Sequence, residues 1–516
     1  MTYSFNLIDQ PWIPCTKLDG RMEELNLRET LARSHELRGV QGDSPLETAS
    51  LYRLLLAVIH SSLRGPKAKK DWVALWNAKQ FDMSRFDKYF KEWHSRFDLF
   101  DKERPFYQVK NNKDGRQKIS NDVLPDVASG ANSTLFSHAT DENNILLTSS
   151  KAARTLLVMQ TFSVAGGWGM APRESSDAPW GRGIIFLVEG DTLFQTLLLN
   201  LLKYPDNDVM PVRDEDKPAW EMDEPFKPKR EQPLGYLDSL TWQNRRVSLI
   251  PIGEEENPLV QEMIISQGLV LAPNVLDPMK HYWIDKKEGF KSNRFAEEKV
   301  LWRDSSALFR VRNSTIARPP AIFLWLSILA DDDKIDMRHS YRFMALGMAT
   351  KGDAKIGFYR HENFPLHIKY LQSDKLLERL SGALIFADKT NEAVKYAGKL
   401  MAFMIVSKSS DEKIGKIPKE HPAQDLFRHW GAERFFWSRL EVPFYEFLQT
   451  LPDDESVLDY WNETLQQTAW DALRNTTRMA GESTKALKAA VRAEGVLRNE
   501  LKKLFEEIQL QQEIAE

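Results

Sequence analysis

The sequence has almost no cysteine, no long apolar run and no large excess of either charge. Its 516 residues include one cysteine, Cys15, which excludes an intramolecular disulfide framework and any zinc or iron–sulfur site built from several cysteines. The most apolar segments, 321–330 and 400–406, are far shorter than the roughly 18 residues that a membrane span needs. Residues 1–15 lack the features of a signal peptide, so we expect a soluble, cytoplasmic protein.

The common catalytic motifs are also missing. The sequence has no phosphate-binding GxxxxGK[ST] loop, no GxSxG elbow and no HExxH zinc motif. Cys15 follows Pro14 in a strand-like segment, where we expect a buried and unreactive thiol. The run Asp331–Asp333 is compatible with a divalent-metal site, but a solvated loop and helix cap explain it more simply. A metal-dependent nucleic-acid enzyme that uses this run and a nearby histidine is therefore kept as the alternative function.

The charges are balanced overall but unevenly distributed. Lys and Arg total 70 against 74 Asp and Glu, for a net charge of −4, so any nucleic-acid surface must be a local patch. Residues 280–318 contain ten basic and five acidic side chains, and residues 471–504 contain eight and four. Such patches attract phosphate in a salt-dependent way, although a solvated helix face has the same composition.

The first part of the chain mixes helix and strand signals. Ser44, Pro45 and Glu47 form an N-cap, a first-turn proline and a third-position acid before a helix that reaches residue 60. A second helix is expected over 149–163. Short strands are expected at 184–188, 247–252, 282–284 and 308–311, and hairpin turns at 285–289 and 351–353.

Helical signals dominate after about residue 365. The expected helices span 373–387, 391–407, 424–450 with an interruption near Pro443, 454–478 and 483–513. The last has an apolar stripe at spacings of three and four formed by Leu487, Ala490, Ala493, Leu497, Leu501, Leu504 and Ile508. We therefore predict an α+β protein with a mixed N-terminal body over 1–365, made of short sheets and helices, and a C-terminal four-helix-type bundle over 366–516.

Two local patterns are compatible with nucleic-acid binding. Gly166, Gly167, Trp168 and Gly169 directly follow the helix predicted over 149–163. The glycines fit a helix end, or a backbone that closely approaches another surface such as a nucleic-acid groove.

The second pattern mixes aromatic and basic residues. Trp283, Phe290, Phe295 and Trp302 are interleaved with the basic residues of 280–303. This arrangement is typical of a surface on which bases stack, but a half-buried sheet gives the same pattern.

A set of short strings, taken in order, resembles a known family. The strings are Asn6–Pro14, Arg104–Gln108, Ser129–Asn132, Gly166–Gly169, Gly181–Gly183 and Val188–Asp191. Their order and spacing resemble the large subunit of the type I-E CRISPR surveillance complex Cascade, the CasA family. The resemblance is strongest over about the first 200 residues, looser from 205 to 340, and resumes at the hairpin and the helical C-terminus.

The resemblance implies a non-catalytic role. The family's large subunit reads a short protospacer-adjacent motif (PAM) in duplex DNA and helps to open the duplex so that guide RNA can pair, while base pairing reads the longer sequence. The implied partners are the backbone, small and guide-end Cascade subunits, the guide RNA, the target DNA and a recruited helicase-nuclease. No metal is expected, because the cysteine cluster of some relatives is absent. We also expect no cofactor, and no membrane partner because the sequence lacks a long apolar run.

Three elements of the family can be placed on this sequence. A loop associated with the guide's end and with the PAM corresponds to Phe136 and His138, the second of which is often Asn in the family. The glycine loop corresponds to Gly166, Gly167, Trp168 and Gly169, whose backbone would enter the minor groove, where readout is degenerate. A wedge hairpin, often with Gln at its tip, corresponds here to a stretch without Gln that includes Lys351, Gly352, Asp353 and Lys355.

Two further DNA contacts follow from the resemblance. Some relatives insert a lysine into the minor groove from the middle region, and Lys280 is the nearest substitute here. The helical C-terminus is expected to dock on the small subunits and to guide the displaced strand through Arg474, Arg478, Lys485, Lys488 and Arg492, although these residues could equally serve solubility alone. A scaffold whose basic patches bind RNA is the third functional interpretation.

Overall fold

The computed structural model describes most of the chain, in two compact units. It describes residues 2–124, 145–166, 175–205, 210, 212–213, 215–227, 229–287, 289–296, 300–311, 317–332, 334–336, 339–351, 355–407 and 421–515. The first unit comprises Met1–Trp302 and Arg310–Phe364, and the second comprises Arg303–Phe309 and Pro365–Glu516. Among the described helices, none is both long enough and apolar enough to cross a bilayer.

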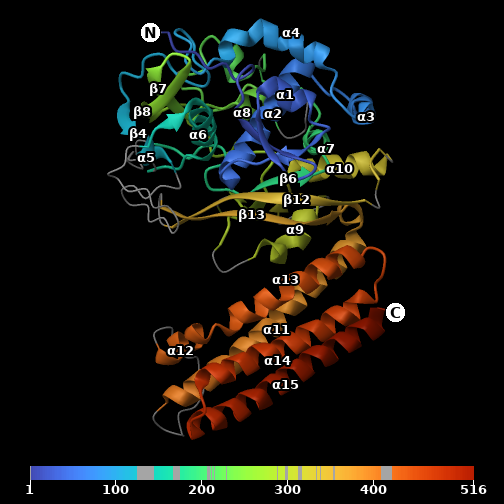
Figure 1. Cartoon of the computed structure of the whole chain (residues 1–516). Coiled ribbons are helices and arrows are strands. Elements are labelled where there is room, and N and C mark those ends of the chain that lie inside the picture. Colours follow the sequence, from blue (N-terminus) through green and yellow to red (C-terminus); the bar gives the residue numbers. More distant parts are fainter. Residues whose placement is uncertain are drawn as a thin grey trace. The chain divides into compact units, whose positions relative to one another are not determined.

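Small antiparallel sheets and helices build the first unit, which confirms the predicted fold class (Figure 1). Its sheets have the strand orders β2-β1-β3, β4-β8-β5 with β7 beside β8, β10-β9-β11, and β13-β12-β6. Its strands are β1 (Ile13–Lys17), β2 (Met22–Leu25), β3 (Leu37–Val40), β4 (Arg116–Ile119), β5 (Leu147–Thr148), β6 (Ile185–Glu189), β7 (Arg245–Glu254), β8 (Asn257–Gln267), β9 (Tyr282–Asp285), β10 (Gly289–Ser292), β11 (Ala317–Arg318), β12 (Ser340–Lys351) and β13 (Lys355–His367).

The helices of this unit are α1 (Leu27–Ala32), α2 (Pro45–Leu63), α3 (Lys69–Ala78), α4 (Met83–Trp93), α5 (Ser120–Val123), α6 (Ser149–Phe162), α7 (Leu193–Leu199), α8 (Tyr236–Leu240) and α10 (Ala321–Asp331), with 3-10 turns at His94–Phe97, Ala219–Glu221 and Leu301–Asp304. Four of them, α4, α6, α7 and α8, contact the buried helix α2. The Ser44 hydroxyl accepts the Glu47 amide at 3.2 Å, which confirms the predicted cap of α2. α2 is buried nearly all round and packs on α6, α8 and β12 at once.

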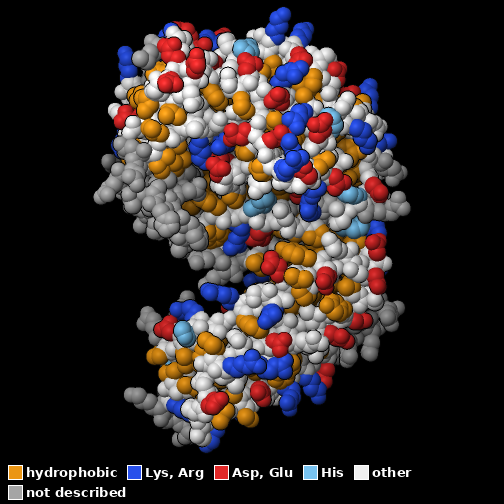
Figure 2. Space-filling view, in the orientation of Figure 1, with side chains coloured by type: hydrophobic (Ala, Val, Ile, Leu, Met, Phe, Trp, Pro, Cys, Tyr) orange, Lys and Arg blue, Asp and Glu red, His pale blue; other side chains and the backbone are white. Residues whose placement is uncertain are grey.

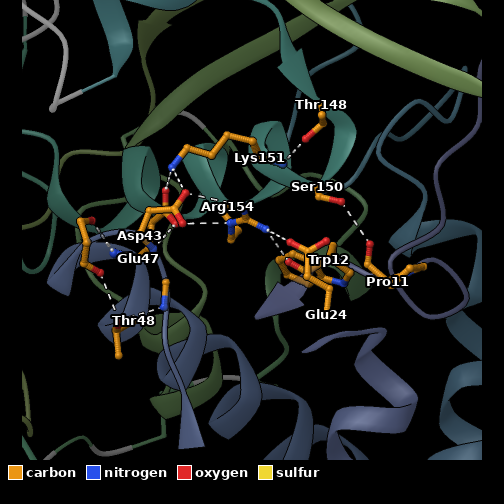
Figure 3. Close-up of polar contacts among 12 residues, drawn as sticks. Pro11, Trp12, Glu24, Asp43, Glu47, Thr48, Thr148, Ser150, Lys151 and Arg154 are labelled. Atoms are coloured by element: carbon orange, nitrogen blue, oxygen red, sulfur yellow. Dashed lines mark hydrogen bonds and ion pairs between the residues drawn. The ribbon is translucent and has the colours of Figure 1, made fainter. Parts of the chain in front are cut away.

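A charge cluster joins the start of α2 to α6 and β2 (Figure 3). The Arg154 guanidinium pairs with Glu47 at 3.3 Å and with Glu24 at 2.9 Å. The neighbouring Lys151 ammonium pairs with Asp43 at 2.7 Å and also with Glu47. Arg154 and Glu47 are both almost fully buried, so each charge depends on the other for compensation.

The strands of the hairpin predicted around 351–353 are present as the neighbours β12 and β13, while residues 352–354 lie outside the described residues. Figure 1 shows β12 and β13 as two long neighbouring strands, with β6 on the other side of β12. The antiparallel register of β6 with β12 runs from the pair Glu189–Arg342 to the pair Ile185–Leu346. The rings of Phe186 in β6 and Phe343 in β12 contact one another and the ring of Phe323 in α10.

The second unit is a helical bundle, as predicted. Its main helices are α11 (Asp374–Val406), α12 (Pro422–Trp430), α13 (Ala432–Thr450), α14 (Val457–Ala480) and α15 (Thr484–Ala515), with α9 (Ser305–Phe309) and a 3-10 turn at Ile368–Leu371 beside them. The two helices expected over 373–407 form the single helix α11. The helix break expected near Pro443 lies instead at Gly431, which has a φ of +65°, while Pro443 is held inside α13.

Two other sequence predictions were wrong in detail. No strand begins at residue 308 as expected. Leu308 and Phe309 instead form the end of helix α9 and are both fully buried. Such a short apolar run does not distinguish a buried strand from a buried helical turn. Leu487, placed in the apolar stripe of α15, is 52% exposed, whereas the adjacent Ala486 is 1% exposed and faces the core.

We predict that Glu47→Gln destabilises the first unit by about 3–5 kcal/mol, because it leaves the buried Arg154 guanidinium without its closest buried charge. Urea unfolding followed by tryptophan fluorescence measures the change. Asp87→Asn, which breaks the half-exposed pair with Arg28, serves as the control and should change stability little. Equal effects of the two substitutions would contradict the assigned role of the buried cluster.

Candidate nucleic-acid interface

Residues 167–174 are called here the glycine segment. The residues on either side of this segment are hydrogen-bonded to one another and form what we call the neck. The neck comprises residues 163–166 on one side and 175–178 on the other. The Ala165 amide donates to the Asp177 carboxylate at 2.8 Å, and the Gly166 amide donates to the Ser175 hydroxyl at 2.8 Å. The Ala178 amide donates to the Ser163 carbonyl at 2.7 Å. The exit and the return of the chain are therefore fixed relative to one another.

A buried arginine is hydrogen-bonded to both sides of the neck. Arg245, at the start of β7, is fully buried, and its guanidinium donates to the Ser176 carbonyl at 3.0 Å and to the Val164 carbonyl at 3.4 Å. Burial lowers the pKa of this group to about 10, and the nearby Asp177 charge opposes the shift. The group therefore stays charged at neutral pH, and hydrogen bonds to oxygens offset the desolvation. Gln267 adds a bond to the Ser176 amide at 2.8 Å.

The string Gly181–Gly183 joins this neck to β6. A Cβ atom on Gly181 would lie 2.5 Å from the Ser163 carbonyl oxygen, and one on Gly183 would lie 2.5 Å from Lys280 Cε. Between them, Arg182 donates from Nε to Asp177 at 2.8 Å and from a terminal nitrogen to the Thr350 hydroxyl at 3.3 Å. Gly181 is needed because a backbone oxygen leaves no room for a side chain, whereas at Gly183 the Lys280 side chain would have to shift.

The sheet β13-β12-β6 places the predicted wedge on the same unit as the neck. Lys351 is the last residue of β12 and Lys355 is the first of β13. Because β6 follows Gly183 directly and pairs with β12, a short stretch of backbone connects the glycine segment with the strands that hold this tip. Two elements that are about 180 residues apart in the sequence thus share one scaffold.

The basic and aromatic segment 280–303 divides into core and surface. Phe295 and Trp302 are buried in the core, but neither lies in a strand, since Trp302 belongs to the 3-10 turn Leu301–Asp304. Ile284 and Phe290 pair across the β9–β10 hairpin and are 40% and 46% exposed. The exposed Lys287 lies beside them, so this hairpin keeps an aromatic and basic face.

Comparison with known proteins decides the family. The family model described as CRISPR-associated protein Cse1 matches residues 6–472. A CasA/Cse1 protein of Thermus thermophilus is 33% identical over 98% of both chains.

The chain belongs to the CasA/Cse1 family. This is the family of the large subunit of the type I-E Cascade surveillance complex. The crystal structure of Thermus thermophilus CasA superimposes with a TM-score of 0.80 at 30% identity, covering 97% of this chain and 99% of that one. Thermobifida fusca Cse1 has a TM-score of 0.81 at 24% identity, with coverages of 97% and 98%, and shows the shared fold.

Several predicted contact residues of this Cse1-family chain lie outside the described residues. They are Phe136, His138, Gly167, Trp168, Gly169, Gly352 and Asp353. Gly166 is described and has a φ of +79°, a left-handed conformation that glycine adopts readily. Lys351 and Lys355 are described as strand ends, and their roles stay predictions.

Lys280 occupies an unusual position for the groove contact expected of it. Its side chain runs along Gly183, and the residue is only 8% exposed. Burial lowers the pKa of its ammonium to about 8, opposed chiefly by the charge of Asp277. To reach a DNA groove, the ammonium would have to leave this contact.

The five basic residues predicted for the bundle lie on α14 and α15. Arg474 is exposed and pairs with Asp471 at 2.5 Å, and Lys485 donates to the Ser407 carbonyl at 2.6 Å. Arg478, Lys488 and Arg492 are exposed. Figure 2 shows Lys and Arg side chains interspersed with Asp and Glu over the face that it draws, which fits local rather than general attraction to phosphate.

The alternative metal site gains no support from the described side chains. Asp331 ends α10, Asp332 pairs with Lys69, and Asp333 lies outside the described residues. Among the residues that the structure describes, no group of three or more His, Cys, Asp or Glu side chains could hold a metal ion. Cys15 is buried, and burial raises the pKa of its thiol to about 12, so the thiol is protonated and unreactive at neutral pH.

Sequence reasoning missed the polar residues that build the neck. Asp177, Arg182 and Arg245 were not singled out, although Arg182 lies inside the string Gly181–Gly183 used for the family resemblance. A charged residue between two glycines was the one available signal. Its partners Asp177 and Thr350 could not be deduced, because no periodicity links them.

We predict that Lys280→Met raises the stability of the first unit by about 1–3 kcal/mol at pH 7. The folded protein holds Lys280 with a pKa near 8, against 10.5 for an exposed lysine, so protonation at neutral pH favours unfolding. The gain should be complete below pH 8 and should vanish as the pH rises toward 10.5. Urea unfolding at several pH values measures it, with the exposed Lys287→Met as control. A gain that does not change with pH would contradict the assignment.

Proposed function

We propose that this protein is a non-catalytic subunit of an RNA-guided antiviral surveillance complex that recognises the PAM in double-stranded DNA. It helps to open the duplex for guide pairing and supports recruitment of a helicase-nuclease. Its partners are the backbone, small and guide-end Cascade subunits, the guide RNA and the target DNA, and it works in the cytoplasm. Membership of the CasA/Cse1 family supports the proposal, and relatives of similar fold include a chain of a CRISPR RNA-guided surveillance complex.

The observation that carries the proposal is the shared scaffold of neck and hairpin. A segment rich in glycine can bring backbone N–H and C=O groups to the edges of bases in the minor groove. The neck gives that segment a fixed base, and the β6–β12 register connects it to β12, which ends at Lys351, and through β12 to β13, which begins at Lys355. Contact with the PAM and separation of the strands beside it can therefore be carried out by elements of one compact unit.

The charge distribution supports binding within a complex. A subunit with a net charge of −4 has little general attraction for DNA, while its basic hairpin β9–β10 and its basic helices α14 and α15 offer local phosphate contacts. Such a subunit binds duplex weakly alone and firmly beside basic partners. The protein then needs to read only a short tag, because guide pairing supplies the remaining specificity.

We predict that Gly169→Leu in the assembled complex weakens binding to a PAM-containing duplex about tenfold or more, equivalent to about 1.4 kcal/mol. A leucine side chain would prevent the close approach of the backbone to the groove. Gly382→Leu on α11, where a Cβ atom meets open space, is the matched control. Binding is measured by electrophoretic mobility shift with guide RNA present. Unaltered binding by Gly169→Leu would sink the role of the glycine segment.

We predict that the double variant Lys351→Ala/Lys355→Ala slows duplex opening about fivefold or more, because two charges that can hold a displaced phosphate are lost. Initial PAM contact should change less. A fluorescent base analogue beside the PAM reports opening. Lys88→Ala/Lys91→Ala removes the same charge from the exposed face of α4 and should open at the normal rate. Equal unwinding by both double variants would count against a wedge at this tip.

The enzymatic alternative has its own test. Magnesium-dependent cleavage of nucleic acid by the purified chain would favour it.

A further inference from the structure

Arg182 lies between the two parts of the protein to which the proposed function assigns different tasks. Its side chain is 17% exposed and bonds in two directions. Nε donates to the Asp177 carboxylate at 2.8 Å, and a terminal nitrogen donates to the Thr350 hydroxyl at 3.3 Å. A planar guanidinium offers donors in a fixed geometry, so the two contacts define one distance between their acceptors.

The Asp177 end of this link belongs to the neck of the glycine segment. The second oxygen of the same carboxylate accepts the Ala165 amide at 2.8 Å. One oxygen of Asp177 therefore binds residues 163–166 of the neck, through the Ala165 amide, and the other binds Arg182. Any displacement of the carboxylate moves the base of the glycine segment as well.

The Thr350 end of the link belongs to the part of the hairpin that extends beyond β6. The β6–β12 register ends at the pair Ile185–Leu346, while β12 continues to Lys351. Thr350 is the penultimate residue of that extension. The bond from Arg182 therefore braces a stretch of β12 that β6 no longer supports.

The flanking glycines fix the point from which Arg182 reaches out. A Cβ atom on Gly181 would lie 2.5 Å from the Ser163 carbonyl oxygen of the neck, and a Cβ atom on Gly183 would lie 2.5 Å from Lys280 Cε. A Cβ atom on Gly347 of β12 would lie 2.9 Å from the Gly183 carbonyl oxygen. The backbone at 181–183 is thus pressed between the neck and β12, which is where a link between them has to start.

We propose that Arg182 is a positioning residue that sets the projecting end of the β12–β13 hairpin at a fixed offset from the neck of the glycine segment. This inference rests on the proposed function, in which the neck presents the PAM-contacting backbone and the hairpin opens the adjacent base pairs. Successive base pairs are separated by about 3.4 Å. A hairpin that drifts by that distance would meet the wrong step, so PAM contact would survive while opening becomes inefficient.

The test uses the assembled complex with guide RNA and the variant Arg182→Gln, which loses the charge and the second donor arm. We expect affinity for a PAM-containing duplex that the guide cannot pair with to stay within about twofold. We expect opening of a matched duplex, followed by a base analogue beside the PAM, to slow about 2- to 30-fold. A matched duplex already unpaired beside the PAM should restore normal guide pairing, which a general loss of structure would not allow.

Thr350 supplies the matched pair of controls. Thr350→Val removes the acceptor and should reproduce the opening defect, whereas Thr350→Ser keeps the hydroxyl and should open normally. Because both changes break one link, the double variant Arg182→Gln/Thr350→Val should be no slower than the slower single variant.

The outcomes separate the inference from the function beneath it. A wild-type complex that binds and opens duplexes regardless of the PAM overturns the proposed function and this inference with it. A wild-type complex that depends on the PAM, together with normal opening by Arg182→Gln, overturns the inference alone. So does a defect that persists on the pre-opened duplex, since it would place the effect in general structure and not in positioning.

Discussion

A buried guanidinium holds together the region on which the rest of the site depends. Arg245 is fully buried, and its two terminal nitrogens donate to carbonyl oxygens on both sides of the neck, those of Val164 and Ser176. Taking a charge out of water is favourable only where such oxygens converge. The neck must therefore close around Arg245, and this requirement fixes where the glycine segment leaves the body and where it returns.

The connection between the neck and the sheet β13-β12-β6 follows from that closure. After residues 175–178 of the neck, the chain passes through Gly181–Gly183 and enters β6, which begins at Ile185 and pairs with β12. The neck and the strands β12 and β13, which are distant in sequence, thereby lie in one compact unit.

The sequence predicted the elements well and their polar connections poorly. Apolar periodicity and the cap at Ser44 located α2, and the turn residues located both hairpins, because these signals are local. The strand expected at 308–311 and the phase of Leu487 were wrong because a short or slightly shifted apolar run fits more than one packing. Ordered strings revealed the family, and family resemblance alone assigned the glycine segment and the wedge. The pairing of Arg182 with Asp177 and Thr350 depends on tertiary contacts that no local pattern encodes.

The central claim is that the PAM is read by the segment that the neck presents. The most direct measurement is photo-crosslinking from a probe placed in the minor groove of the PAM, within the complete complex, followed by mapping of the attached peptide. We predict attachment within residues 163–183. Attachment confined to α14 and α15, or to other subunits, would contradict the claim.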